Sequence, residues 1–210
     1  MRSHRTRRPP AGAPIFFAIC EWGDDAPETW APAIAQSYRA GPDHLPFWSW
    51  PNTGGVGQGV IDVINNMATV NSASRPYAWA DPDFLETGII VSLTESTDSE
   101  TEFAAWAIMG GPMLIATDVR NMSAWKASVV MNRDLLEVNG DTTAPGAQVY
   151  AQNVTGVQVW AKPLSNGDVA AVFINANDFT TLVVTLAWDQ IGWPAGANVS
   201  VYDMWAHQPV

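Results

Sequence analysis

The sequence has a single cysteine, Cys20, and only two lysines, Lys126 and Lys162, among its 210 residues. One cysteine excludes a disulfide within the chain. The apolar runs are all shorter than the roughly 20 residues that a membrane-spanning helix needs. Basic residues are scarce beyond the first eight positions: the net charge is −11, and residues 1–8 hold four arginines and no acid, which leaves −15 on the rest. Such an acidic body argues against a nucleic-acid partner, because phosphate binding needs a basic surface.

A cluster of metal ligands is also missing from the sequence. The three histidines, His4, His44 and His207, are scattered, so we expect neither a metal nor a cofactor. The N-terminus is basic but lacks the apolar stretch of a secretory signal peptide. Residues 1–13 are rich in arginine and proline, and we predict a disordered arm there. With 47% hydrophobic and 15% charged residues, the remainder has the composition of a globular chain.

Residues 14–145 alternate between short apolar runs and helical patterns. The run PIFFAICE at 14–21 is apolar throughout and ends in an acid, as expected of a strand buried on both faces. Further strands are expected at 45–50, 77–79 and 112–116, and helices at 28–38, 60–70, 99–109 and 124–131. This order predicts a parallel sheet built from βα units.

Acidic residues recur directly after the predicted strands, at Glu21, Asp43, Asp81, Asp83 and Asp118. The carboxyl ends of the strands carry the chemistry in a β/α barrel, which makes these side chains candidates for catalysis. Paired carboxylates suit glycoside hydrolysis, in which a retaining enzyme sets two carboxyl groups about 5–5.5 Å apart. The residues alone also fit plainer interpretations, since such acids are common in solvated turns and Arg39 could cap a helix.

The pattern changes after about residue 145. Short β-rich segments occur at 157–162, 169–175, 182–187 and 199–203, separated by turn residues such as Ser165-Asn166-Gly167. This spacing predicts an antiparallel β module over 146–210.

Several short motifs occur in one order along the chain. They are CEWG at 20–23, TWA at 29–31, YRAGPD at 38–43, WADPDFLE at 79–86, WAIM at 106–109, PMLI at 112–115, DVRNMS at 118–123, VWAKPLS at 159–165 and DMWAH at 203–207. Together they resemble the motifs of family 27 of the glycoside hydrolases, the α-galactosidase family. The resemblance implies an α/β fold: the second half of a (β/α)₈ TIM barrel, strands five to eight, over 14–145, and a partial antiparallel β-sandwich over 146–210.

The resemblance also implies roles for individual residues. Asp43, four residues after Arg39, matches the general acid/base, which protonates the leaving oxygen and then deprotonates the attacking water. Arg39 matches a sugar-binding arginine, and Glu21 matches the residue that hydrogen-bonds the sugar 2-hydroxyl. The other implied substrate-binding positions are Trp22 and Trp79, as aromatic walls, with Asp81 and Asp83 beside them.

The sequence departs from the family pattern in one respect that affects catalysis. The family's nucleophile is an aspartate in a Lys-x-Asp setting upstream of the CEWG motif. No acid and no lysine precede Glu21, so we predict a truncated chain that lacks the nucleophile and has doubtful activity alone. The pocket is expected to differ in shape as well, because Ala80 and Phe84 replace the family's Asn and Met.

For the complete enzyme, the resemblance implies retaining hydrolysis of terminal α-linked galactose on a small-molecule or oligosaccharide substrate. The alternatives are a non-catalytic carbohydrate-binding fragment or pseudoenzyme, and an α-N-acetylgalactosaminidase, which Glu21 disfavours because an acetamido group needs a smaller residue. We expect no nucleic-acid and no membrane partner, and the open sheet edges of a half barrel would allow a homo-oligomer. The full-length enzyme would be secreted, lysosomal or vacuolar.

Overall fold

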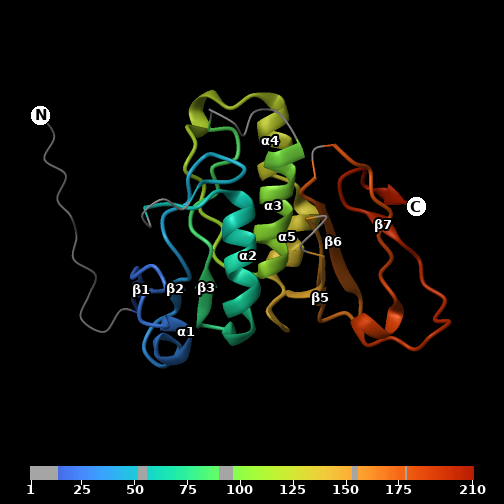
Figure 1. Ribbon diagram of the computed structural model, residues 1–210, viewed down its shortest axis with the longest axis horizontal. Coiled ribbons are helices and arrows are strands. Elements are labelled where there is room, and N and C mark those ends of the chain that lie inside the picture. The colour runs from blue at the N-terminus through green and yellow to red at the C-terminus, as the bar shows by residue number, and fades with distance from the viewer. Residues whose placement is uncertain (1–13, 52–55, 90–96, 153–155, 178) are drawn as a thin grey trace, which may run out of the picture.

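The computed structural model describes residues 14–51, 56–89, 97–152, 156–177 and 179–210, so the predicted arm at 1–13 lies outside the described residues. A parallel α/β part is followed by an antiparallel β part, as Figure 1 shows from blue to red. The predicted fold class is therefore confirmed at this level. None of the helices within the described ranges is long and apolar enough to cross a membrane.

The parallel sheet contains β1 (Ala18–Ile19), β2 (Ser37–Arg39) and β3 (Trp79–Asp81) in that order. Ile19 is in register with Tyr38, and Tyr38 with Ala80. All three residues of β2 are buried, because this strand has a neighbour on each side. A parallel bridge between Leu85 and Ile115 is all that forms where a strand at 112–116 was expected. The sheet brings the carboxyl ends of β1, β2 and β3 to one edge.

The predicted helix at 28–38 is wrong. The chain forms only α1 (Pro27–Trp30) and a 3-10 turn at Ala31–Ala33 before it enters β2. Tyr38 does not continue a helical stripe, because it lies on β2 between two strands and is fully buried. The predicted strand at 45–50 is wrong too, since that segment is a loop that approaches Gln58 through the Leu45 N–H.

The remaining helices follow the prediction more closely. They are α2 (Val60–Val70), α3 (Thr97–Met109), α4 (Ala124–Val130) and α5 (Arg133–Gly140), of which α5 was not predicted. In Figure 1, α3 lies between α2 and α5. Its C-terminal residues from Phe103 to Met109 are all buried, which is why α3 shows little amphipathic pattern. Asn132 separates α4 from α5 and caps the latter through Leu135 N.

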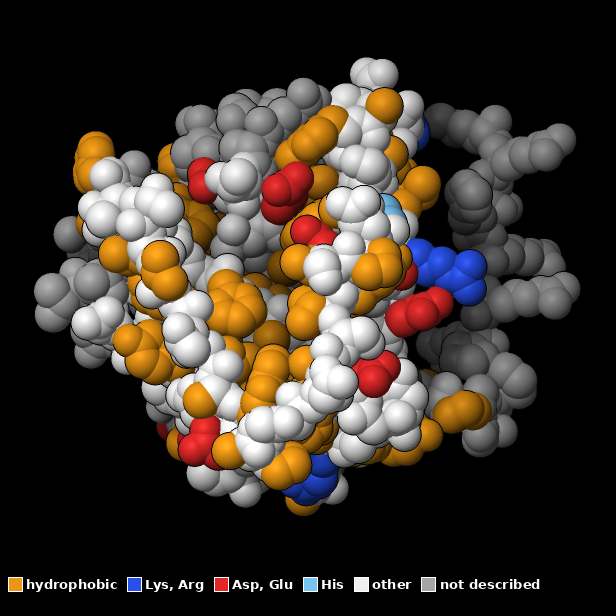
Figure 2. All heavy atoms as spheres, turned by 90° about the vertical axis from the view of Figure 1, so that its right-hand side faces the viewer, with side chains coloured by type: hydrophobic (Ala, Val, Ile, Leu, Met, Phe, Trp, Pro, Cys, Tyr) orange, Lys and Arg blue, Asp and Glu red, His pale blue; other side chains and the backbone are white. Residues whose placement is uncertain are grey.

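The C-terminal part contains the sheet β4 (Ala147–Gln152), β5 (Val157–Pro163) and β6 (Val169–Asn175), with antiparallel neighbours as predicted. A separate pair joins β7 (Tyr202–Asp203) to β8 (Gln208–Pro209). The predicted strand at 182–187 does not form. Of the predicted strand at 199–203, only Tyr202–Asp203 pairs with another strand, as β7. Figure 2 shows hydrophobic side chains gathered on the side of the molecule where β6 and β7 lie.

A buried lysine joins the two parts. Lys162 of β5 has no exposed surface, and its Nζ donates to the carbonyl of Val138, 2.7 Å away, in the last turn of α5. The carbonyls of a helix C-terminus lack partners within the helix, so the ammonium satisfies one of them. Burial lowers the pKa of Lys162 from 10.5 to about 8.

Replacing this lysine with methionine tests its charge. Because the folded chain binds fewer protons than the unfolded chain between pH 8 and 10.5, wild-type stability is expected to rise over that interval. The Lys162→Met variant lacks the titrating amine and therefore this rise in stability. We expect the free energy of unfolding, wild type minus variant, to increase by on the order of 2–3 kcal/mol in urea titrations between pH 8 and 10.5. A difference that stays constant with pH would contradict the lowered pKa.

Candidate active site

An arginine joins two aspartates at the carboxyl edge of the parallel sheet. Arg39 ends β2, and its Nη2 lies 2.7 Å from Asp43 Oδ1 and 2.7 Å from Asp83 Oδ2. Arg39 and Asp83 are buried, whereas the side chain of Asp43 is 50% exposed. The three residues form a charged network with one carboxylate open to solvent, and we refer to Arg39, Asp43 and Asp83 as the arginine network.

Asp83 is held in an unusual backbone conformation, with φ at +82°. Non-glycine residues seldom adopt this region, so the surroundings must hold the turn in place. Its carboxylate accepts from the N–H groups of His44 and Phe84, both at 2.8 Å, and its own N–H donates to Asp81 Oδ1. The indole of Trp106 donates to the Asp83 carbonyl at 2.8 Å. The position of Asp83 is therefore determined by several elements at once.

Two further acids lie at the same edge. Glu21 follows β1 and accepts from Asp25 N through Oε2, while its Oε1 is buried without a hydrogen-bond partner among the described residues. Cys20, its neighbour, contacts Arg39 Nη1 at 3.9 Å, which brings the end of β1 to the arginine network. Burial raises the pKa of Asp81, the last residue of β3.

The two tryptophans of the predicted site lie in different surroundings. Trp22 follows β1 with φ at +64°, and Gly23 is close enough to Ala40 that an added Cβ would lie 2.6 Å from the Ala40 carbonyl oxygen. This turn therefore needs glycine and places Trp22 beside the chain that leaves β2. Trp79, at the start of β3, packs next to Gly110 at the end of α3, where an added Cβ would lie 3.5 Å from its ring.

Behind the arginine network lie titratable residues that the sequence patterns did not single out. Glu102 of α3 has no exposed surface, and burial raises its pKa to about 8. Burial also raises the pKa of Glu86 to about 7 and lowers that of His44. An acid inside an apolar helix was the only sequence signal for Glu102, and His44 gave none. At neutral pH these groups are neutral or partly so, unlike the charged residues in front of them.

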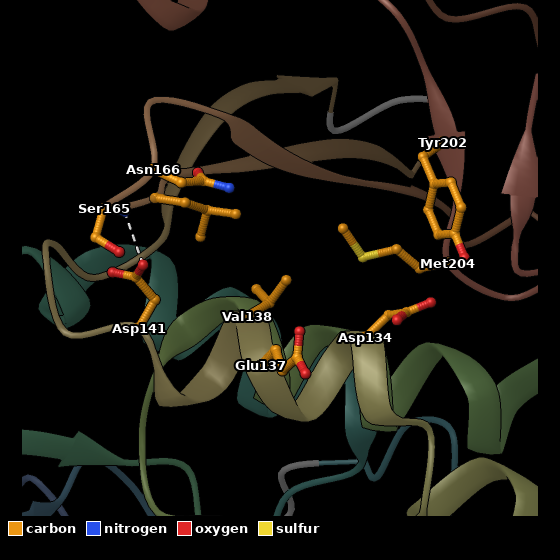
Figure 3. Close-up of a pocket in the computed structure, with 9 residues that line it drawn as sticks. Asp134, Glu137, Val138, Asp141, Ser165, Asn166, Tyr202 and Met204 are labelled. Carbon is orange, nitrogen blue, oxygen red and sulfur yellow. Dashed lines mark hydrogen bonds between the residues drawn. The ribbon is translucent and has the colours of Figure 1, made fainter.

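A pocket lies away from this edge, between α5 and the β7 region (Figure 3), with a volume of about 290 Å³. Asp134, Glu137 and Asp141 line one wall, and Asp141 points toward Ser165, whose N–H donates to it at 2.7 Å. Asp134 already contacts His207 at 2.7 Å. No residue predicted for the site lines this pocket. The described residues also contain no group of three or more His, Cys, Asp or Glu side chains arranged for a metal ion.

Comparison with known proteins identifies the family. The family models described as "Alpha galactosidase A" and "Alpha galactosidase C-terminal beta sandwich domain" match residues 49–141 and 154–210. The chain is 33% identical over 201 residues to an α-galactosidase of Oryza sativa subsp. japonica, covering 93% of this chain and 44% of that protein. It is 31% identical over 198 residues to an α-galactosidase of Cyamopsis tetragonoloba, covering 94% and 45%.

Solved structures agree on the fold. Alpha-galactosidase I from Mortierella vinacea superposes with a TM-score of 0.86 at 23% identity, covering 94% of this chain and 53% of that one. The Saccharomyces cerevisiae α-galactosidase solved with raffinose gives a TM-score of 0.83 at 24% identity, covering 94% and 49%. The chain spans less than half the length of the two curated plant relatives. The family models and the curated relatives show that the chain belongs to the α-galactosidase family, family 27 of the glycoside hydrolases.

Proposed function

We propose that these residues supply the acid/base side of the active site of a retaining α-galactosidase. The observation that carries the proposal is the position of Asp43, a half-exposed carboxylate held at the end of a parallel strand by Arg39. The contact with Arg39 uses Oδ1, so Oδ2 is the oxygen that would face a glycosidic bond. Asp83 is buried and bonded at both carboxylate oxygens, and it suits a structural or orienting role.

The other residues provide hydrogen bonds to a hexose. Glu21 Oε1 is buried and unpartnered among the described residues, so a sugar hydroxyl that donates to it would remove an unfavourable state. We assign it to the 2-hydroxyl. Arg39 is the charge-assisted donor beside it, and Asp81 orients the turn that carries Asp83. Trp22 is the proposed aromatic wall, whereas the packing of Trp79 against Gly110 favours a role in the core.

A retaining mechanism needs a second carboxylate about 5–5.5 Å from the first. Residues 1–20, which end just after β1, contain no acid. We propose that strands β1 to β3 and the segment around Ile115 form strands five to eight of a barrel, and that the nucleophile comes from a part of the barrel that these 210 residues do not contain. Asp43 would then protonate the leaving oxygen and later deprotonate the water that attacks the glycosyl-enzyme intermediate from the same face.

The proposal is tested by joining these residues to the part of the Oryza sativa α-galactosidase that they do not cover, so that a nucleophile is supplied, and then replacing Asp43 with asparagine and assaying an aryl α-galactoside. Loss of the proton donor is expected to lower the rate by about 10²–10⁴-fold. Asp118→Asn is the matched control: Asp118 is exposed, is paired only with Arg120 on its own turn in the described contacts, and should leave the rate unchanged. Turnover that survives in Asp43→Asn would refute the assigned role. A wild-type chain that neither cleaves the galactoside nor binds galactose in calorimetry would refute the function.

A further inference from the structure

His44 makes two hydrogen bonds to the turn that carries Asp83. Its peptide N–H donates to Asp83 Oδ2 at 2.8 Å, and its ring Nδ1 lies 2.9 Å from the carbonyl oxygen of Phe84. One residue thus holds two consecutive residues of a turn whose backbone is strained at φ +82°. The residue before it in the chain is Asp43, so His44 connects both aspartates of the arginine network.

The hydrogen bond to Phe84 fixes the tautomer of the ring. A carbonyl oxygen only accepts, so Nδ1 must carry the proton. In the neutral ring Nε2 then holds a lone pair, and this atom is buried without a partner among the described residues. A second proton on Nε2 would bury both a charge and an unsatisfied donor, which is unfavourable. The geometry therefore requires a neutral, Nδ1-protonated imidazole, and burial lowers the pKa of His44 in agreement.

Burial keeps the His44 ring neutral, although two of the groups around it favour the charged form. Glu102 Oε1 lies 3.7 Å from Nδ1, but that oxygen accepts from Glu86 N at 2.7 Å, and Oε2 accepts from the Thr87 hydroxyl at 2.6 Å. The other charged groups that act on His44 are Asp83, which raises its pKa, and Arg39, which lowers it. The indole of Trp106 covers the ring, with centroids 5.1 Å apart. With Glu102 protonated, the buried anion beside the ring is Asp83, and Arg39 pairs with it at 2.7 Å.

We propose that His44 is a positioning residue, whose Nδ1–H and peptide N–H clamp the Asp83–Phe84 turn and so hold the Asp83 carboxylate on Arg39. In the enzyme these hydrogen bonds hold the Arg39 guanidinium, which in turn binds the Asp43 carboxylate. The inference rests on the proposed function only for its role in catalysis, because the clamp itself is visible in the free chain.

Two variants of the whole chain separate the side-chain clamp from simple packing. His44→Asn can place its amide donor near the Nδ1 position, whereas His44→Leu keeps the bulk and removes the donor. The peptide N–H bond to Asp83 is retained in both. His44→Gln, whose amide reaches toward the Nε2 position, gives the same contrast if His44→Leu fails to fold.

The first readout is nitrogen NMR and needs no sugar. Wild type is expected to show a neutral Nδ1–H ring for His44 from pH 6 to 8, and separate, slowly exchanging Nη signals for Arg39. The Arg39 Nη signals should stay separate in His44→Asn and should merge into averaged signals in His44→Leu or His44→Gln. The Nη signals of the exposed Arg133 should be averaged in every sample. A His44 ring that is charged or Nε2-protonated in this range, or Arg39 signals unaffected by loss of the donor, would overturn the clamp.

The second readout is galactose affinity by calorimetry. The affinity is expected to fall about tenfold in His44→Leu, the effect of one lost hydrogen bond, and to stay within about twofold of wild type in His44→Asn. Equal losses in both variants would overturn the role of the donor. A wild-type chain without affinity for galactose would count against the proposed function, while the NMR result would still decide the clamp.

Discussion

Replacing Arg39 with leucine is expected to lower the free energy of unfolding by about 3–5 kcal/mol. The substitution leaves Asp83, a buried carboxylate, without the cation that lies 2.7 Å from it. A charge buried without its partner loses the attraction that offset its desolvation, so the full desolvation free energy destabilises the folded state. Urea unfolding of the whole chain at pH 7 measures the change.

Arg133→Leu is the matched control. Arg133 contacts Glu137 at 2.9 Å, but their side chains are 86% and 66% exposed, so the pair is solvated. Its loss should change stability by less than about 0.5 kcal/mol. If Arg39→Leu proved as mild as Arg133→Leu, the buried arginine network described above would not exist in solution.

Replacing Glu102 with glutamine is expected to remove a large part of the pH dependence of stability. Burial raises the pKa of Glu102 from 4.5 to about 8, so the folded chain holds a proton that the unfolded chain releases between these values. The stabilisation is complete below pH 4.5 and is lost as the pH rises through 8. Glutamine keeps the shape of the neutral acid and does not titrate. Wild-type stability relative to the variant should fall by on the order of 3–5 kcal/mol between pH 4.5 and 8.

The comparison with the variant matters because Glu86 titrates in the same interval, with its pKa raised to about 7. Both proteins share that contribution, so the difference isolates Glu102. Glu137→Gln on the exposed face of α5 is the control for the loss of one helix carboxylate. Unfolding measured in urea at pH 5, 6, 7 and 8 is sufficient. A wild-type curve parallel to that of Glu102→Gln would show that Glu102 is ionised in the folded chain.

The sequence predicted the elements whose local pattern agrees with their packing. The helix at 60–70 has one apolar face and was predicted with the bounds of α2. Strands β5 and β6 were expected within one residue of their bounds, because apolar runs flank a Ser-Asn-Gly turn. The segment 28–38 failed because Trp30, Ile34 and Tyr38 have helical spacing, while pairing with both β1 and β3 determines where Tyr38 lies.

The same division holds for the site. The resemblance to the family's motifs implied Arg39, Asp43 and Asp83, and the structure brings these three together. Their connection through one guanidinium depends on the parallel register of β2 and β3, which no local pattern specifies. Burial determines the charge state of Glu102, and Phe84 determines the tautomer of His44. Neither follows from the residue types, because both depend on contacts with other segments, 15 and 16 residues away for Glu102 and 40 residues away for His44.

The central claim is that the edge formed by Glu21, Arg39, Asp43 and Asp83 binds galactose, and an NMR titration of the labelled chain with galactose tests it most directly. 2-Deoxygalactose, which lacks the hydroxyl assigned to Glu21, is the control sugar. The account predicts saturable shifts at Arg39 and at the backbone of 21 and 83 with galactose, smaller shifts with 2-deoxygalactose, and none at the pocket of Figure 3. Shifts confined to that pocket, or an unchanged Arg39 at saturating galactose, would contradict it.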